Sequence, residues 1–154
     1  MKIVDSFNAL SRFGQVSIIL SLVILTISIT QPAFYIESKE DPEAWADSWL
    51  LFLFGWTFPL GGAFVPFLIW LANPIYIISI IFTLKGKKIG FYLSFLASLI
   101  AISFIKFDSI ITSESGRESP IKSLELGYKL WLTSLVIMSI GTGINLYFKR
   151  RGDR

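Results

Sequence analysis

The sequence predicts an all-α integral membrane protein, with four transmembrane helices in an antiparallel bundle and one short interfacial or re-entrant helix. Three observations predict this fold class: an apolar composition, four long apolar runs, and an alternation of basic and acidic connecting segments. Hydrophobic residues make up 53% of the 154 positions and charged residues only 16%, well below the roughly 25% of an average soluble domain. Because the connections are short, residues 1–154 are expected to form a single membrane domain.

The four apolar runs are each long enough to cross a bilayer as a helix. A hydrocarbon core about 30 Å thick needs roughly 17 to 25 helical residues, since each residue rises about 1.5 Å. The first run has the basic start of a signal peptide, but it is long for one and is not followed by a small-x-small cleavage site. We therefore expect it to be retained as a span. The predicted spans are residues 13–30, 63–84, 89–105 and 128–148.

Charged residues alternate between the two ends of the predicted spans. Nine of the 14 Lys and Arg residues lie before the first span, between the second and third, or after the fourth. Nine of the 11 acidic residues lie after the first span or after the third. Basic residues in short loops stay on the cytoplasmic side of a membrane. We therefore expect both termini in the cytoplasm and the acidic segments outside, in a plasma membrane and in particular a bacterial inner membrane.

An apolar segment at residues 48–56 is too short to span a membrane. Residues 59–62, which contain one Pro and two Gly, separate it from the second span, because Pro lacks the N–H that a helix needs and paired Gly favours a turn. Trp49 and Trp56 are typical of side chains at headgroup level. We predict an interfacial or re-entrant helix that acts as a linker. The alternative is a lid or a surface to which a partner docks.

The two acidic connecting segments are predicted to lie outside the membrane. Residues 37–47 carry five acidic side chains and are expected to lie in the outer aqueous space. Residues 108–123 are rich in Ser and also contain Gly and Pro, which is typical of a flexible polar loop.

Small and polar residues recur in three spans at the intervals of helix packing. Helices in lipid gain little hydrophobic energy by meeting, so close approach over small residues holds them together. We predict that these residues form the contacts within one bundle, because short loops place consecutive helices side by side. The alternative is a homo-oligomer in which one stripe joins two copies. The residues are Gly14, Ser17, Ser21 and Ser28, then Gly90, Ser94, Ala97, Ser98 and Ala101, and finally Ser134, Gly141 and Asn145.

Asn73 and Pro74 are the most conspicuous polar feature of the predicted spans. Pro74 removes a backbone donor and frees the carbonyl group of Trp70, so the helix should kink. The amide of Asn73 must find partners away from lipid. We interpret the pair as a hinge with an interhelical hydrogen bond. The alternative is a broken-helix binding site of the kind that transporters build at mid-membrane, with Asn73, Pro74, Trp70 and Trp56 as candidate binding residues.

Missing residue types narrow the function. The chain has no Cys and no His, which argues against thiol–disulfide exchange, iron–sulfur clusters, b-type haem, most zinc sites and Ser-His-Asp catalysis. Proton-coupled transport requires an ionisable residue deep in a span, and none of the predicted spans contains one there. We therefore expect no cofactor, no metal and no enzymatic activity. Nucleic acid is not an expected partner, because the basic clusters lie at span ends, where membrane orientation and anionic lipids account for them.

Two classes of function remain. The favoured one is a non-enzymatic small polytopic membrane protein that acts through protein–protein contact, as an accessory subunit, an assembly factor or an immunity-type protein. Its expected partners are the lipid bilayer and a protein in the membrane or at its outer face. The alternative is a small oligomeric channel or facilitator that uses the Asn73-Pro74 kink. An intramembrane enzyme is least favoured, because no acid–base pair lies in the predicted spans.

Overall fold

The computed structural model describes residues 3–36, 45–111 and 118–152 of the chain. Four helices in these ranges are long and apolar enough to cross a membrane. They confirm the four predicted apolar runs, with ends that differ by at most two residues. They are α2 (Arg12–Ile29), α4 with α5 (Phe64–Trp70 and Ala72–Leu84), α6 with the 3-10 helix η2 (Ile89–Ser103 and Phe104–Lys106), and α7 (Leu126–Gly152), whose apolar part is Leu126–Phe148.

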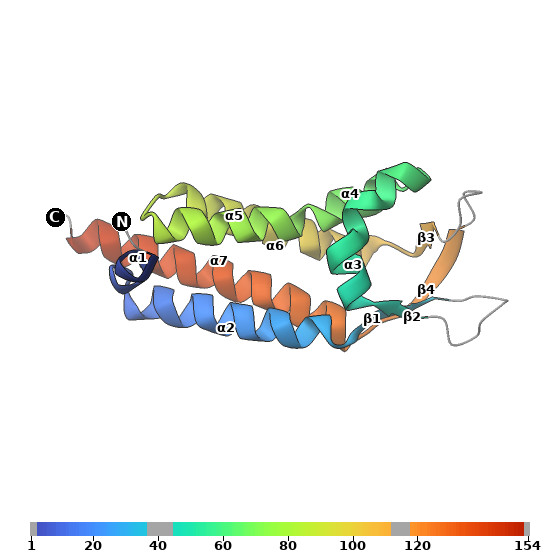
Figure 1. The fold of residues 1–154 in the computed structure, drawn as a ribbon, viewed down its shortest axis with the longest axis horizontal. Coiled ribbons are helices and arrows are strands. Elements are labelled where there is room, and N and C mark those ends of the chain that lie inside the picture. Colours follow the sequence, from blue (N-terminus) through green and yellow to red (C-terminus); the bar gives the residue numbers. More distant parts are fainter. Residues whose placement is uncertain (1–2, 37–44, 112–117, 153–154) are drawn as a thin grey trace.

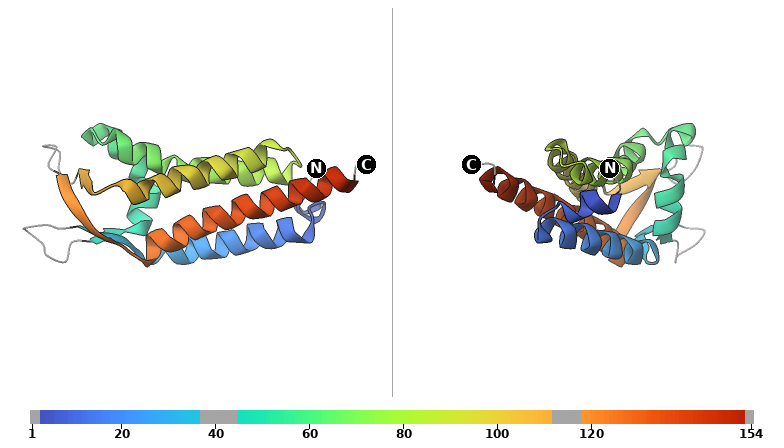
Figure 2. Two further views of the ribbon diagram at one scale, coloured as in Figure 1. Left: turned by 180° about the vertical axis from the view of Figure 1, so that it is seen from behind. Right: turned by 60° about the vertical axis from the view of Figure 1, so that its left-hand side comes forward.

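The long helices lie side by side along the longest axis of the molecule (Figure 1). Helix α2 packs against α7, α7 against α6, and α6 against α5. Both termini, the short helix α1 (Ile3–Asn8) and the turn between α5 and α6 lie at one end (Figures 1 and 2). All the strands that the structure describes lie at the other end, which we call the sheet end (Figure 1).

The predicted stripes of small residues face neighbouring helices of the same chain. Every member of the stripe on α6 is buried, as are Gly14, Ser21 and Ser28 on α2 and Ser134 and Gly141 on α7. Ser17 and Asn145 are partly buried. A Cβ atom added at Gly141 would overlap Ser17 of α2, and one at Gly14 would lie 3.1 Å from the Asn145 side chain of α7. The prediction that these residues make contacts within the chain is therefore confirmed.

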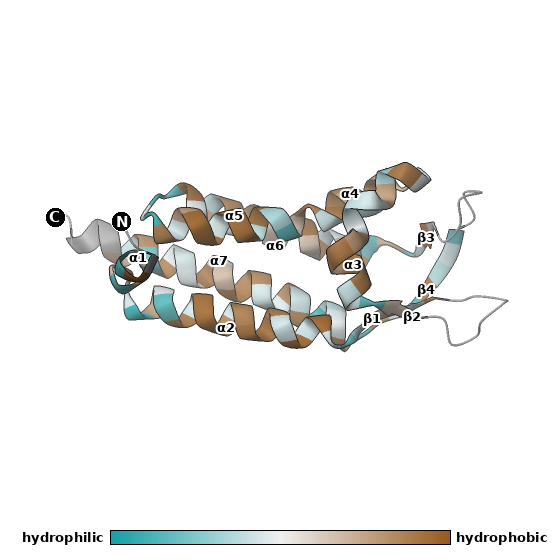
Figure 3. Cartoon of the chain, viewed as in Figure 1, coloured by the Kyte–Doolittle hydropathy of each residue, from teal (hydrophilic) through white to brown (hydrophobic). Residues whose placement is uncertain are grey.

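Polar side chains meet inside the group of helices, whereas large apolar side chains point outward. The hydroxyl groups of Ser21 and Tyr76 are 2.8 Å apart and join α2 to α5. Those of Ser94 and Thr142, also 2.8 Å apart, join α6 to α7. The outward sides of the helices are mostly hydrophobic (Figure 3). An interior of small polar residues and an exterior of large apolar ones suits a helix group surrounded by lipid.

A four-stranded antiparallel sheet at the sheet end corrects the all-α prediction. The prediction of an irregular loop over residues 108–123 is also wrong where strands form. The first strand pairs with the last, Phe34 opposite Leu124, so its hydrogen-bonding partner is distant in sequence and no local pattern shows it. Residues 37–44, most of the acidic segment, lie outside the described residues. The strands are β1 (Pro32–Ile36), β2 (Trp45–Asp47), β3 (Ser109–Ile111) and β4 (Glu118–Leu124), in the order β2-β1-β4-β3.

A short helix lies across the ends of the long helices, between the sheet and the second span (Figure 1). This helix, α3 (Ser48–Phe54), occupies the place predicted for the short apolar helix, and the chain then continues as the 3-10 helix η1 (Gly55–Gly61). Gly55 is buried against Trp70, where a Cβ atom would overlap the indole ring. Gly62 has a φ of 79°, which lets the chain turn from η1 into α4.

Candidate functional site

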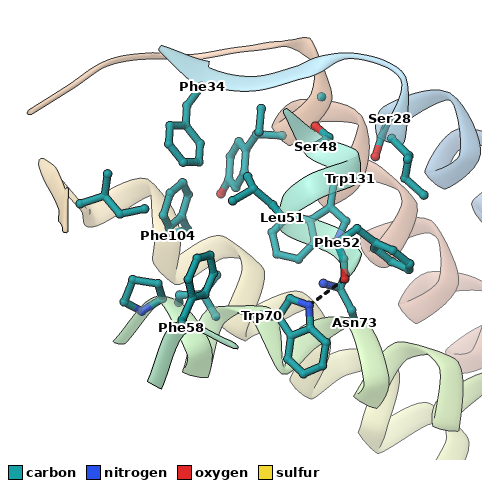
Figure 4. Close-up of a pocket in the computed structure, with 17 residues that line it drawn as sticks. Ser28, Phe34, Ser48, Leu51, Phe52, Phe58, Trp70, Asn73, Phe104 and Trp131 are labelled. Atoms are coloured by element: carbon teal, nitrogen blue, oxygen red, sulfur yellow. Dashed lines mark hydrogen bonds between the residues drawn. The ribbon is translucent and has the colours of Figure 1, made fainter. Parts of the chain in front are cut away.

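A cavity with a volume of about 100 Å³ lies at the sheet end, among residues from all four spans and from α3, η1, β1 and β3 (Figure 4). Most of its wall is apolar, and none of the described residues that line it is charged. Its wall is notably rich in aromatic side chains. They are Phe34, Phe52, Phe58, Trp70, Phe104, Tyr128 and Trp131.

The interruption of the second span shapes one wall of this cavity. Helix α4 ends at Trp70 and α5 begins at Ala72, with a turn at Leu71 between them. Pro74 has no N–H to donate to the Trp70 carbonyl, which explains an interruption at this point. The kink that the sequence predicts is therefore present, and it places the side chains of Trp70 and Asn73 at the cavity (Figure 4).

Polar groups of the aromatic residues hold the cavity walls together. The indole Nε1 of Trp131 donates to Oδ1 of Asn73 over 2.7 Å, which joins α7 to α5. The indole Nε1 of Trp70 donates to the Phe52 carbonyl over 2.9 Å, joining α4 to α3. The Tyr128 hydroxyl donates to the Ala101 carbonyl of α6 over 2.8 Å. These bonds leave mainly ring faces and edges for an occupant.

Ser48 is one of the residues that line the cavity, and its hydroxyl group is enclosed by protein atoms. Its Oγ is buried and has no hydrogen-bond partner among the described residues. Gly127 lies directly beside it, since a Cβ atom at that position would overlap the Ser48 Oγ. The sequence did not point to Ser48, because a Ser at the start of a helix is ordinarily explained by the helix terminus itself. The signal available was a lone hydroxyl ahead of six apolar residues.

Two of the four candidate binding residues line the cavity. Trp70 and Asn73 do so, whereas Pro74 is only half-buried next to Asn73 and is not part of the wall. Trp56 lies on η1, is 55% exposed and does not reach the cavity. Asn73 is 8% exposed, and its bond to Trp131 is the interhelical hydrogen bond that the hinge interpretation predicts.

The aromatic residues that extend the cavity toward the sheet were not predicted from the sequence. Their rings form a connected series: Phe34 to Phe104 at 5.5 Å between centroids, Phe104 to Tyr128 at 5.4 Å, and Tyr128 to Trp131 at 5.9 Å. The spacing of Tyr128 and Trp131 was a usable signal, because residues three apart lie on one helix face. Phe34 gave none, because its strand was not predicted.

A second feature of the sheet end is an exposed apolar surface on α3, η1 and the start of α4, which we call the outer apolar surface. Its side chains lie on the side of α3 away from the cavity or at the tip formed by η1 and α4. Leu60 is 83% exposed and Phe64 is 64% exposed. The surface comprises Trp49, Leu50, Leu53, Phe54, Trp56, Leu60 and Phe64.

Comparison of the chain with protein families, with curated proteins and with solved structures found no match. The fold itself therefore defines the class: a mostly helical chain with four helices able to cross a membrane, which carries a small sheet and an aromatic cavity at one end.

Proposed function

We propose that the chain is an integral membrane protein that acts without catalysis, through contact between its outer apolar surface and a partner protein. The roles that fit such a protein are those of an accessory subunit, an assembly factor or an immunity-type protein. The partner lies in the membrane or at its outer face. In a homo-oligomer, the partner at this surface is a second copy of the same chain.

The charges at the two ends of the molecule support a location in the plasma membrane with both termini in the cytoplasm. The turn at the terminal end carries exposed Lys85, Lys87 and Lys88. The described part of the sheet end carries acidic residues, among them Asp108 and Glu118. Because basic segments stay in the cytoplasm, this arrangement supports an orientation with the sheet and the outer apolar surface outside.

The composition of α3 is the observation that carries the proposal. Leu51 and Phe52 face the cavity, while Trp49, Leu53 and Phe54 are 46%, 55% and 50% exposed on the other side. A helix that lies at a membrane surface normally has a strongly polar face toward water, and α3 has none after its first residue. A helix that is apolar all round is normally covered all round. The outward side of α3 thus calls for a cover, which a partner protein would supply.

The polar groups of the spans support contact more than conduction. A pore needs polar side chains that face a common axis. Here the hydroxyl groups of Ser21 and Tyr76 bond to each other, as do Asn73 and Trp131. Since these groups satisfy one another across helices, their contribution is to packing. The channel alternative has no comparable observation in its favour.

A pair of variants tests the proposal. Trp56→Ala removes a large exposed ring from the outer apolar surface, and Asn73→Leu removes the amide that a channel would use. Both variants carry a C-terminal affinity tag and are purified from membranes in mild detergent. We expect Trp56→Ala to reduce the partner that copurifies and Asn73→Leu to leave it unchanged. Loss of solute flux into proteoliposomes with Asn73→Leu, while Trp56→Ala changes neither flux nor copurification, would favour the channel.

A further inference from the structure

A small hollow lies at the end of the molecule that holds both termini, between the turn that joins α5 to α6 and the facing part of α7. Its volume is about 20 Å³, which is room for one group the size of a water molecule. Lys87 and Lys88 line the hollow and are exposed, so it opens at the surface. Its other polar side chains are those of Thr83 and Thr142, which are buried, and of Asn145, which is partly buried.

The charge around this hollow is positive. Lys85, Lys87 and Lys88 all lie in the turn between α5 and α6, and all three are exposed. No acidic residue is among the described residues that line the hollow. The electrostatic potential at its mouth therefore favours a negatively charged ligand.

Asn145 supplies a hydrogen-bond donor to the hollow. Its Oδ1 accepts from the backbone N–H of Ser11 over 3.0 Å, and this bond fixes the orientation of the amide. The Nδ2 group keeps two N–H donors, and none of the described residues accepts a hydrogen bond from them. The hydroxyl groups of Thr83 and Thr142 already donate to carbonyl groups of their own helices. A ligand oxygen that accepts a hydrogen bond therefore finds its donor at Asn145.

The hollow lies at the level where the apolar spans end. Helix α5 ends at Leu84 and α6 begins at Ile89, while the apolar part of α7 ends at Phe148. The Nζ atom of Lys87 lies 5.5 Å from the centre of the Phe82 ring, so the ammonium group stays close to the end of the span. In a bilayer this is the level of the lipid headgroups.

We propose that the hollow binds the phosphate group of an anionic phospholipid. One phosphate oxygen enters the hollow and accepts a hydrogen bond from the Nδ2 group of Asn145. The ammonium groups of Lys87 and Lys88 neutralise the charge of the phosphate at the mouth of the hollow. The acyl chains of the lipid run beside the apolar outward sides of the helices. The inference rests on the membrane location proposed above, but not on contact with a partner protein.

Two lipids with the same acyl chains test the role of charge. The protein is purified in a maltoside detergent and mixed with dioleoylphosphatidylglycerol, which is anionic, or with dioleoylphosphatidylcholine, which has a phosphate group but no net charge. Native mass spectrometry counts the lipids bound at each concentration. We expect one phosphatidylglycerol to bind at least about fivefold more tightly than phosphatidylcholine, the scale of one basic residue near an anionic lipid. Equal binding of the two lipids would overturn the proposal.

A double variant tests the two lysines. Lys87→Gln combined with Lys88→Gln should abolish the preference for phosphatidylglycerol. The matched control is Lys106→Gln combined with Lys129→Gln, which removes the same charge from exposed positions near the sheet end and should keep the preference. A preference that is lost equally in both proteins would mean that net charge attracts the lipid, and one that is kept in both would exclude the two lysines. Either result would contradict the proposal.

Asn145→Asp tests the hydrogen bond. This change keeps an oxygen that can accept from Ser11 and replaces the Nδ2 group with a second oxygen, which repels a phosphate. Asn8→Asp is the matched control, because it adds the same charge at an exposed position of α1 at the same end of the molecule. We expect Asn145→Asp to lose the tight site and Asn8→Asp to keep it. A folded Asn145→Asp protein that binds phosphatidylglycerol as tightly as the control would contradict the proposal. If Asn145→Asp does not fold, the lysine variants decide alone.

Thermal unfolding in detergent distinguishes a lipid from free phosphate. A ligand that binds only the folded protein raises the midpoint of unfolding. We expect phosphatidylglycerol to raise it more than phosphatidylcholine, and millimolar inorganic phosphate to leave it unchanged, because the free ion has no acyl chains to hold it beside the spans. An equal rise with inorganic phosphate would overturn the lipid in favour of the free ion. Equal binding of both lipids by a protein whose reporter fusions show four spans would refute this inference and leave the membrane location intact.

Discussion

Trp131 of α7 donates a hydrogen bond from its indole Nε1 to Oδ1 of Asn73 on α5, over 2.7 Å and 58 positions of sequence. The bond lies just past the point where the second span resumes after its interruption at Leu71. It therefore ties the broken helix to the last span. Asn73 is held in the wall of the aromatic cavity by this bond.

Double substitution should reveal the coupling between these two residues. Asn73→Leu and Trp131→Phe each remove one partner, so each should lower the free energy of unfolding in detergent. The double variant should lose less free energy of unfolding than the sum of the two single losses. The difference, which is the coupling energy, should be about 0.6 kcal/mol and at most about 1.7 kcal/mol, the range found for hydrogen bonds between membrane helices. The measurement is unfolding of the four proteins by denaturant in mixed micelles. Strictly additive losses would show that the bond contributes nothing.

Tyr76→Phe should destabilise the protein through loss of a single buried hydrogen bond. Tyr76 is 1% exposed, and its hydroxyl is 2.8 Å from that of Ser21 on α2. Removal of the hydroxyl should cost about 1 kcal/mol, because the Ser21 hydroxyl loses this bond across helices. Tyr92→Phe is the control, since Tyr92 is 58% exposed on α6. The measurement is thermal unfolding of both variants in detergent, and equal effects would refute the prediction.

Gly141→Ala should destabilise the contact between α2 and α7. The added Cβ atom would overlap Ser17, so one helix must move away from the other. Overpacking of this kind typically costs about 1 to 3 kcal/mol. Gly61→Ala is the matched change in open space, where a Cβ atom meets nothing within 4 Å. Thermal unfolding should show a lower midpoint for Gly141→Ala alone, and an unchanged midpoint would mean that the helices do not meet as described.

The sequence was sufficient to predict the spans and their contacts. Long apolar runs and the spacing of residues such as Ser94 and Ala97 are local properties, and lipid forces every backbone group in a span to bond within its own helix. The pattern therefore translates directly into helices with buried small faces. The hinge at Pro74 and the hydrogen bond of Asn73 could be predicted for the same reason, because each arises from the chemistry of a single residue.

The sheet and most of the cavity could not be predicted in this way. Strand β3 has only three residues, and β4 contains Pro120, so neither shows a clear strand pattern. Their pairing depends on residues far away in the chain. Phe104 and Tyr128 belong to apolar segments in which aromatic residues facing lipid and aromatic residues facing a cavity look alike. The cavity exists because the ends of several helices and strands meet, and their meeting is a property of the tertiary fold.

The orientation in the membrane is tested by reporter fusions. Fusions at Lys87 and after the last residue should report the cytoplasm, and one at Ser115 should report the outside, because the basic residues gather at the terminal end. An enzymatic reporter that is active on only one side of the membrane makes the measurement. A cytoplasmic signal at Ser115 would reverse the orientation and place the outer apolar surface on the inner face.

Photocrosslinking in intact cells tests the contact function most directly. A photoreactive benzophenone amino acid replaces Trp56 on the outer apolar surface, and in a control protein it replaces Ile19, which is 54% exposed on the outward side of α2. We predict one discrete protein adduct at position 56, either with another protein or with a second copy of this chain, and no protein adduct at position 19. Adducts at neither position, or equal adducts at both, would contradict a specific protein contact at this surface.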